Sequence, residues 1–138
     1  LIGRDGLDLL KKALSSDASA AVRAQAATAL ASFKSDPGSV TLLVAALKDK
    51  SGRVRLAALR ALARRDEKDS TLALKALLAQ SPPPEPALIA IAALAERGEE
   101  AELDLPEITL GQKDPELKAL AVSVLASSRK PRARELLI

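Results

Sequence analysis

The sequence lacks cysteine, histidine, methionine, tryptophan and tyrosine, and Phe33 is its only aromatic residue. Without cysteine or histidine the chain can form neither a disulfide nor a thiolate or imidazole zinc site, and it has none of the usual nucleophile–base pairs. A single ring also leaves no platform on which nucleotide bases can stack. These absences predict a non-enzymatic protein that needs no cofactor and holds no metal ion.

Long apolar runs and an excess of one charge are absent too. No run approaches the roughly 20 residues that a membrane span requires. The 21 basic and 18 acidic residues leave a net charge of +3 and are mixed along the chain, which disfavours nucleic acid as a partner. The lack of cysteine fits the cytoplasm and the periplasm equally, so the composition predicts no compartment.

The residues that are present favour helices. Hydrophobic residues make up 48% of 138 residues, enough for the core of one domain. These residues are mostly alanine and leucine, which are strong helix formers, whereas β-branched residues are sparse and no alternating strand pattern occurs. We therefore predict an all-α protein with a single domain over residues 1–138.

A repeated segment defines the organisation of the chain. It has an apolar start, small residues four and seven positions later, and another apolar residue at the eighth, which is the stripe of a buried helix. Successive copies start 32, 32 and 31 residues apart. The four copies are Val22–Leu30, Val54–Leu62, Pro86–Leu94 and Leu117–Leu125.

An amphipathic segment precedes each copy, so the chain is predicted to form four helix pairs. These first segments are Leu7–Leu14, Leu42–Leu47, Leu72–Leu78 and Leu103–Leu110. One pair cannot bury its apolar face alone, and stacking of about three or more pairs completes a core. The predicted repeats cover about residues 5–34, 37–66, 69–98 and 101–128.

The turn inside each pair contains a short polar residue that suits the start of the second helix. Such side chains accept hydrogen bonds from the free N–H groups of a first helical turn. The predicted N-caps are Asp17, Asp49, Ser81 and Asp114. In the third pair we expect Pro86 to open the second helix.

The run Leu47-Lys48-Asp49 followed by Val54-Arg55 and a helix of small residues resembles a HEAT repeat. Leu110–Leu120 and Leu14–Leu30 match the same pattern. The likeness is strongest to the short bacterial HEAT-like class that also occurs in phycobilin lyases. This resemblance implies a right-handed α–α superhelix, or solenoid, of about four helix pairs.

The resemblance also implies a ladder of charges that links neighbouring repeats, in which the turn acid meets the base near the start of the second helix. The corresponding residues are Asp17, Asp49 and Asp114 with Arg23, Arg55 and Lys118. Ser81 and Ala87 replace acid and base in the third repeat, so we expect the ladder to be interrupted there.

In a solenoid of this kind the second helices line the concave face, which is the usual binding surface. Helical phase places Leu56, Arg60, Arg64 and Leu88 there, together with small residues such as Ala24. We predict that the two leucines form an apolar spot flanked by the two arginines. The alternative is that Leu56 and Leu88 simply pack between adjacent helices.

The favoured function is a scaffold that binds a protein partner through this concave face. One alternative is binding of a nucleic-acid backbone through Arg53–Arg65, and another is an accessory or regulatory module of a larger enzyme, as in phycobilin lyases. Residues 131–138 look like the start of a further helix. Because its apolar end lacks a covering helix, we expect the natural chain to be longer.

Overall fold

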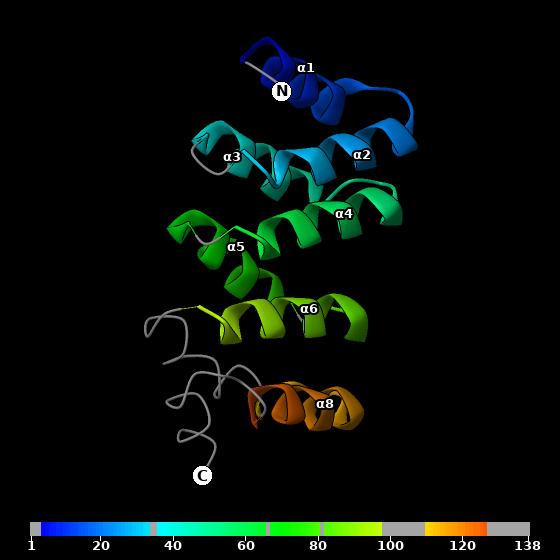
Figure 1. Ribbon diagram of the computed structural model, residues 1–138. Helices are drawn as coiled ribbons and strands as arrows, with labels where there is room; N and C mark the ends of the chain where they lie inside the picture. Colours follow the sequence, from blue (N-terminus) through cyan, green and yellow to red (C-terminus); the bar gives the residue numbers. More distant parts are fainter. Residues whose placement is uncertain (1–3, 34–35, 66, 81, 98–109, 127–138) are drawn as a thin grey trace. The chain divides into compact units, whose positions relative to one another are not determined.

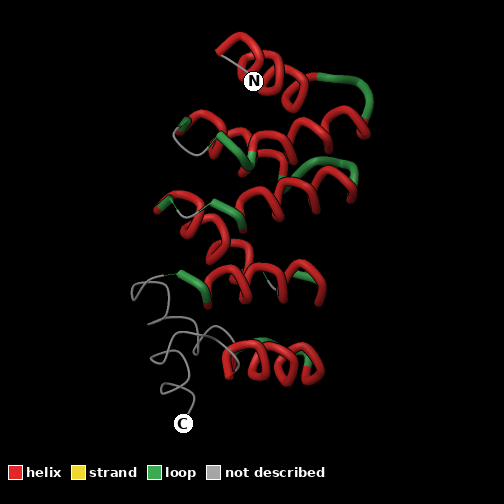
Figure 2. The backbone as a smooth tube through the Cα atoms, viewed as in Figure 1, coloured by secondary structure: helices red, strands yellow, loops and turns green. Residues whose placement is uncertain are grey.

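The computed structural model describes residues 4–33, 36–65, 67–80, 82–97 and 110–126, and all regular structure among them is α-helical (Figure 2). The predicted all-α class is therefore confirmed. The helices are α1 (Arg4–Ser16), α2 (Ala20–Leu30), α3 (Pro37–Ala46), α4 (Gly52–Ala63), α5 (Lys68–Ala79), α6 (Pro84–Ala95) and α8 (Pro115–Ala126).

The helices belong to two compact units, Leu1–Ser70 and Thr71–Ile138. The first unit contains α1 to α4 and the second contains most of α5 with α6 and α8. Packing of a first helix on the second helix of its pair is described for the first unit. A single array of repeats over residues 1–138 stays a prediction.

In the first unit, equivalent helices of neighbouring pairs lie against each other. The second helix α2 packs on α4, and the first helix α1 contacts α3 (Figure 1). Within the pairs, α1 packs on α2 and α3 packs on α4. This arrangement of helix pairs is that of a HEAT-like solenoid, and it brings one long side of α2 next to one long side of α4.

Alanine allows α2 and α4 to approach closely. Ala27 on α2 and Ala58 on α4 are fully buried, as are Leu30 and Leu62 near the helix ends. A small side chain at a helix contact shortens the distance between the axes, while the leucines fill the remaining space. The stripe predicted from the repeat is buried throughout in α4, whereas in α2 its first residue, Val22, is 41% exposed.

In the second unit, α6 packs on α8. The helix α6 is apolar around most of its circumference, which is typical of a helix covered on several sides. Ala90, Ile91 and Leu94 on α6 are fully buried, and Leu117 and Ala121 of α8 are also in the core. The stripe positions Ala90, Leu94, Leu117 and Ala121 are therefore buried here as well.

Two of the predicted N-caps were wrong. Ser19 and Ser51 occupy the N-cap positions of α2 and α4. The carboxylates of Asp17 and Asp49 accept the backbone N–H groups of these serines, at 2.8 and 2.9 Å. An aspartate readily closes a turn by accepting from the residue two positions later, which shifts the cap to the serine.

The other helix starts give mixed outcomes. Asp114 accepts from the backbone N–H groups of Glu116 and Leu117 and caps α8 as predicted. The prediction for the third pair was wrong, since α6 begins at Pro84 with Pro83 at its N-cap position. Proline suits such a start because its missing N–H group would have had no partner in the first turn. Ser81 itself lies outside the described residues.

Two further predictions fall on segments that the structure does not describe. Of the predicted helix Leu103–Leu110, only Leu110 belongs to the described residues. The predicted start of another helix at residues 131–138 lies outside them entirely.

Candidate functional site

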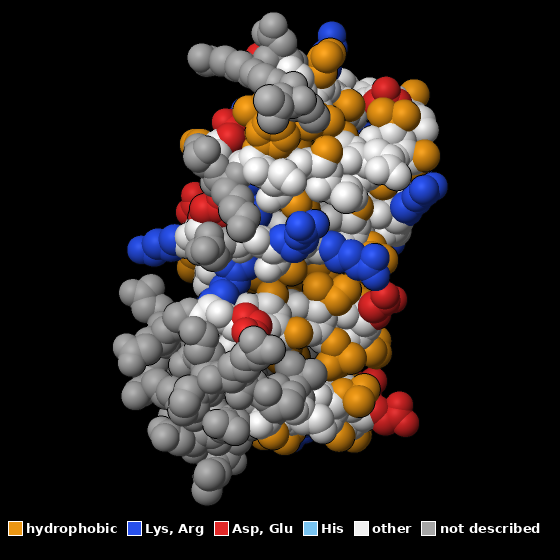
Figure 3. All heavy atoms as spheres, viewed as in Figure 1, with side chains coloured by type: hydrophobic (Ala, Val, Ile, Leu, Met, Phe, Trp, Pro, Cys, Tyr) orange, Lys and Arg blue, Asp and Glu red, His pale blue; other side chains and the backbone are white. Residues whose placement is uncertain are grey.

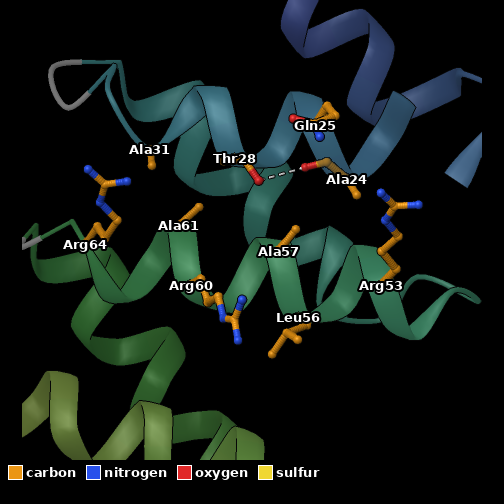
Figure 4. A pocket seen from close by; sticks show the side chains of 10 residues that line it. All are labelled: Ala24, Gln25, Thr28, Ala31, Arg53, Leu56, Ala57, Arg60, Ala61 and Arg64. Carbon is orange, nitrogen blue, oxygen red and sulfur yellow. Dashed lines mark hydrogen bonds between the residues drawn. The ribbon is translucent and has the colours of Figure 1, made fainter. Parts of the chain in front are cut away.

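A cavity of about 340 Å³ lies between α2 and α4 in the first unit (Figure 4). The α2 side is formed by Ala24, Gln25 and Thr28, with Ala31 at the end of the helix. The Thr28 hydroxyl donates to the Ala24 carbonyl at 3.0 Å, so it is satisfied by its own helix. This side of the cavity is uncharged.

The α4 side carries the large side chains. Its lining residues follow one face of the helix, because they recur at intervals of three and four positions. They are Arg53, Leu56, Ala57, Arg60, Ala61 and Arg64. We call this cavity the α2–α4 groove. Figure 4 shows the three arginines spread along the whole length of α4, with Leu56 between the first two.

The groove is positively charged. Arg53, Arg60 and Arg64 are exposed, and none of the residues that line the groove is acidic. Within the described part of the chain, the side chains of Arg53 and Arg64 take part in no ion pair. Figure 3 shows basic side chains gathered over α4.

The structure brings together three of the four residues predicted for the concave face. Leu56, Arg60 and Arg64 all line the α2–α4 groove. Leu88 lies on α6 in the second unit and is half-buried, so the apolar spot shared with Leu56 stays a prediction. Ala24 was predicted to point outward; it lines the groove but is only 5% exposed.

Arg53 is a groove residue that the sequence analysis did not single out. It precedes Leu56 by three positions and Arg60 by seven, which are the intervals of one helix face. That spacing was visible in the sequence. It was hidden by a run of five arginines, Arg53 to Arg65, whose side chains have very different environments.

Arg23 links the two pairs of the first unit. Its Nε and Nη2 atoms donate to the Asp49 carboxylate at 3.0 and 3.1 Å, and Nη1 donates to the Asp17 carbonyl oxygen at 2.8 Å. Arg23 is only 7% exposed. These hydrogen bonds from Arg23, followed by the one from the Ser51 backbone, hold the pKa of the Asp49 carboxyl below its usual value.

The other residues of the predicted ladder lie in different settings. Arg55 is exposed and donates from Nη1 to the Asp49 carbonyl oxygen at 2.7 Å, so it stays within its own turn. Asp114 is engaged in capping α8, and Lys118 lies half-buried on the same helix. A ladder that continues along the chain therefore stays a prediction.

Arg65 has a structural setting that the sequence did not reveal. Its side chain is 0% exposed, and Nη1 donates to the Leu30 carbonyl oxygen at 2.9 Å. Nη2 donates to the Asp36 carbonyl oxygen at 3.2 Å, and two nitrogens contact the Glu67 carboxylate at 2.9 and 3.1 Å. The helix dipole favours cations at a helix C-terminus, where both Arg64 and Arg65 lie in the sequence. Arg64 is exposed, so its attraction to the helix dipole is the interaction with the fold that its position indicates. Arg65 is instead held by hydrogen bonds in the interior.

A second ion pair joins the two first helices of this unit. Lys11 on α1 contacts the Asp36 carboxylate at 2.6 Å, and the same carboxylate accepts from the Ser39 backbone and hydroxyl. The hydrogen bond with Lys11, and then that with Ser39, lowers the pKa of Asp36. Asp36 therefore caps α3 and connects it to α1 through the ion pair with Lys11.

The described residues contain no group of three or more acidic side chains placed to hold a metal ion. None of the helices in the described ranges is long and apolar enough to cross a membrane. The residues that line the groove supply positive charge and apolar contact.

A family model described as HEAT repeats matches residues 7–95, which run from α1 to the end of α6 and include both sides of the α2–α4 groove. No curated protein matches the chain.

Proposed function

Because this chain belongs to the HEAT repeats, which generally mediate contacts between proteins, we propose that it is a non-catalytic scaffold that binds a protein partner through the α2–α4 groove. In this proposal the groove is part of the concave face of the repeat array. The observation that carries the proposal is the clustering of Leu56, Arg60 and Arg64 around one cavity.

The chemistry of the groove supports a protein partner. Its floor includes apolar groups, while its open edge carries arginines that are exposed at the surface. Arginine is enriched at protein interfaces, since its long stem packs on apolar groups and its planar head donates several hydrogen bonds. The groove combines both contributions along one face of α4.

Binding of a nucleic-acid backbone is the second candidate, because three arginines on one face would attract phosphates. The run Arg53–Arg65 supplies fewer available charges than its sequence suggests. Arg65 is buried and Arg55 donates to a carbonyl of its own turn. No aromatic residue lines the groove to stack a base, so a protein partner remains the favoured occupant. No described residue favours a role as an accessory module of a larger enzyme.

An affinity capture from a lysate tests the proposal. The bait is the wild-type chain, and the groove variant is Leu56→Asp/Arg60→Glu. The matched control is Val44→Asp/Lys48→Glu, which makes the same two changes four residues apart on exposed positions outside the groove.

We expect at least one protein to be captured by the wild type and by the control but not by the groove variant. Circular dichroism should show that all three chains are equally helical. Identical captures by all three would contradict the proposal and place any binding elsewhere. Capture of nucleic acid alone, released at high salt, would favour the second candidate.

A further inference from the structure

We propose that the α2–α4 groove is selective for an acidic protein segment that carries an apolar side chain. Carboxylates of the segment would pair with Arg53 and Arg64, and its apolar side chain would lie against Leu56. This inference rests on the proposed function and adds the chemistry of the partner. It follows from the charge of the groove, from the position of Arg53, and from the composition of the floor.

Arg53 has no role in the fold that explains its presence. It is exposed, it takes part in no ion pair among the described residues, and it lies in the first turn of α4. The first turn of a helix carries the positive end of the helix dipole, so a cation there is unfavourable. No acidic residue of that turn compensates it. An external anion at this point would interact favourably with both the arginine and the helix end.

The arginines are spaced so that one segment can reach all of them. Arg60 and Arg64 follow Arg53 by 7 and 11 positions on the same face of α4. At about 1.5 Å of rise per residue, the outer two are separated by about 16 Å along the helix axis. About five residues of extended chain, or about three turns of helix, cover this length. A short acidic segment lying along α4 can therefore pair with both ends of the groove.

The apolar residues of α4 that line the floor of the groove favour an apolar side chain of the partner. Leu56 is half-buried, and Ala57 and Ala61 are small, which leaves the space that forms the cavity. Apolar surface gives a polyphosphate backbone no favourable contact, whereas a leucine or valine of a partner would be taken out of water there. The combination of charge and apolar floor favours an acidic peptide over a nucleic acid.

A random library of short peptides tests this directly, because it imposes no composition in advance. The library is selected on the wild-type chain and counter-selected on Leu56→Asp/Arg60→Glu. We expect the enriched peptides to have a net negative charge and at least one large apolar residue. A labelled member should bind the Val44→Asp/Lys48→Glu control as tightly as the wild type.

The outcomes separate the two proposals. If the enriched peptides need the groove but are neutral or basic, the inference is overturned and the proposed function stands. If no peptide depends on the groove, both are overturned. If a single-stranded DNA oligonucleotide binds the groove more tightly than every enriched peptide, the nucleic-acid candidate replaces both.

A second measurement isolates the charges. The variant Arg53→Gln/Arg64→Gln should weaken binding of an enriched peptide by about tenfold at low salt, since each exposed ion pair contributes a few-fold. The control Lys12→Gln/Lys48→Gln removes the same net charge from exposed positions outside the groove and should change binding by less than about twofold. Equal losses in the two variants would show that only the overall charge matters and would overturn the inference.

Discussion

Arginine occupies two contrasting regions of the first unit. At the boundary between the helix pairs, Arg23 and Arg65 are buried and donate to carbonyl oxygens and to one carboxylate each. We call these the interior arginines. Along the α2–α4 groove, Arg53, Arg60 and Arg64 are exposed. The contrast is sharpest between Arg64 and Arg65, neighbours in the sequence with opposite environments.

This difference teaches that the same side chain is structural in one region and available for recognition in the other. An interior arginine such as Arg65 gives the Leu30 and Asp36 carbonyl oxygens a second hydrogen bond, beside those from the Phe33 and Ser39 N–H groups. Its removal takes these buried charge-assisted hydrogen bonds away and leaves the Glu67 carboxylate without this ion pair. A groove arginine is solvated, so its removal alters the surface charge and leaves the core unchanged. Stability and binding should therefore respond to different arginines.

Substitution of Arg65 is the strongest challenge to this contrast. Arg65→Met fills similar space but donates no hydrogen bond to Leu30 or Glu67. We expect the free energy of unfolding to fall by about 2 kcal/mol, because buried charge-assisted hydrogen bonds are lost and Glu67 loses its partner. Urea unfolding followed by circular dichroism measures it. The neighbouring Arg64→Met should change stability by less than about 0.5 kcal/mol. Similar losses of unfolding free energy for both variants would contradict the distinction between interior and groove arginines.

The ion pair of Arg23 with Asp49 gives a pH-dependent signature. Because the pKa of Asp49 is lowered in the folded state, its ionised form stabilises the fold above the pKa of the unfolded chain, about 3.9. This stabilisation is lost as the pH falls below about 4 toward the folded pKa. Asp49→Asn should thus be less stable than wild type in urea unfolding at neutral pH, and the difference should shrink steadily as the pH is lowered through this range.

Asp49→Asn in an Arg23→Met background tests whether Arg23 causes the pH dependence of this stabilisation. Without the guanidinium, the main cause of the lowered pKa of Asp49 is gone. The change in unfolding free energy caused by Asp49→Asn should then depend much less on pH. A pH dependence that persists unchanged would show that Arg23 is not its source.

Substitution of Asp36 should have a smaller effect on the free energy of unfolding. Its carboxylate caps α3 and contacts Lys11. Asp36→Ala should lower the free energy of unfolding by about 1 kcal/mol through loss of the cap. Lys11→Met keeps the cap, and it should cost about 0.5 kcal/mol. Thermal unfolding distinguishes the two, and equal losses would assign the whole effect to the ion pair.

The groove arginines offer the smallest changes in stability but opposite signs. Arg53 lies at the first turn of α4 and Arg64 at its C-cap. Arg53→Glu should raise the free energy of unfolding by about 0.5 kcal/mol, and Arg64→Glu should lower it by a similar amount, because the helix dipole favours acids at the start and bases at the end. Urea unfolding measures both, and both variants should lose binding of an acidic peptide. Loss of stability in both would show that Arg53 has a structural role.

Much of the fold could be predicted from the repeat. The second helices were expected at Val22–Leu30 and Val54–Leu62, and α2 and α4 contain both segments. The first residues of these helices were predicted less well, since aspartate is a favoured N-cap residue and the pattern therefore indicated Asp17 and Asp49 as the caps. The choice between an aspartate and a serine two positions later depends on how the turn closes, which residue preferences alone do not settle.

The candidate site was only partly accessible to the same reasoning. Helical phase placed Leu56, Arg60 and Arg64 on one face, and all three line the groove. Phase also placed Ala24 on this face, where it lines the groove, but it did not predict that Ala24 is only 5% exposed. Phase could also have separated Arg53 from the other arginines of its run, since it precedes Leu56 by three positions and Arg60 by seven.

The sequence by itself determined the all-α class, the helix pairs and the family, because a hydrophobic period of a helix and its recurrence are properties of a linear string. Only the tertiary structure decided which arginines are interior and which face the groove. Arg64 and Arg65 differ by one position, yet their environments are set by Leu30, Asp36 and Glu67, which surround one and not the other. Burial depends on what packs nearby in space, and that is settled when the pairs stack.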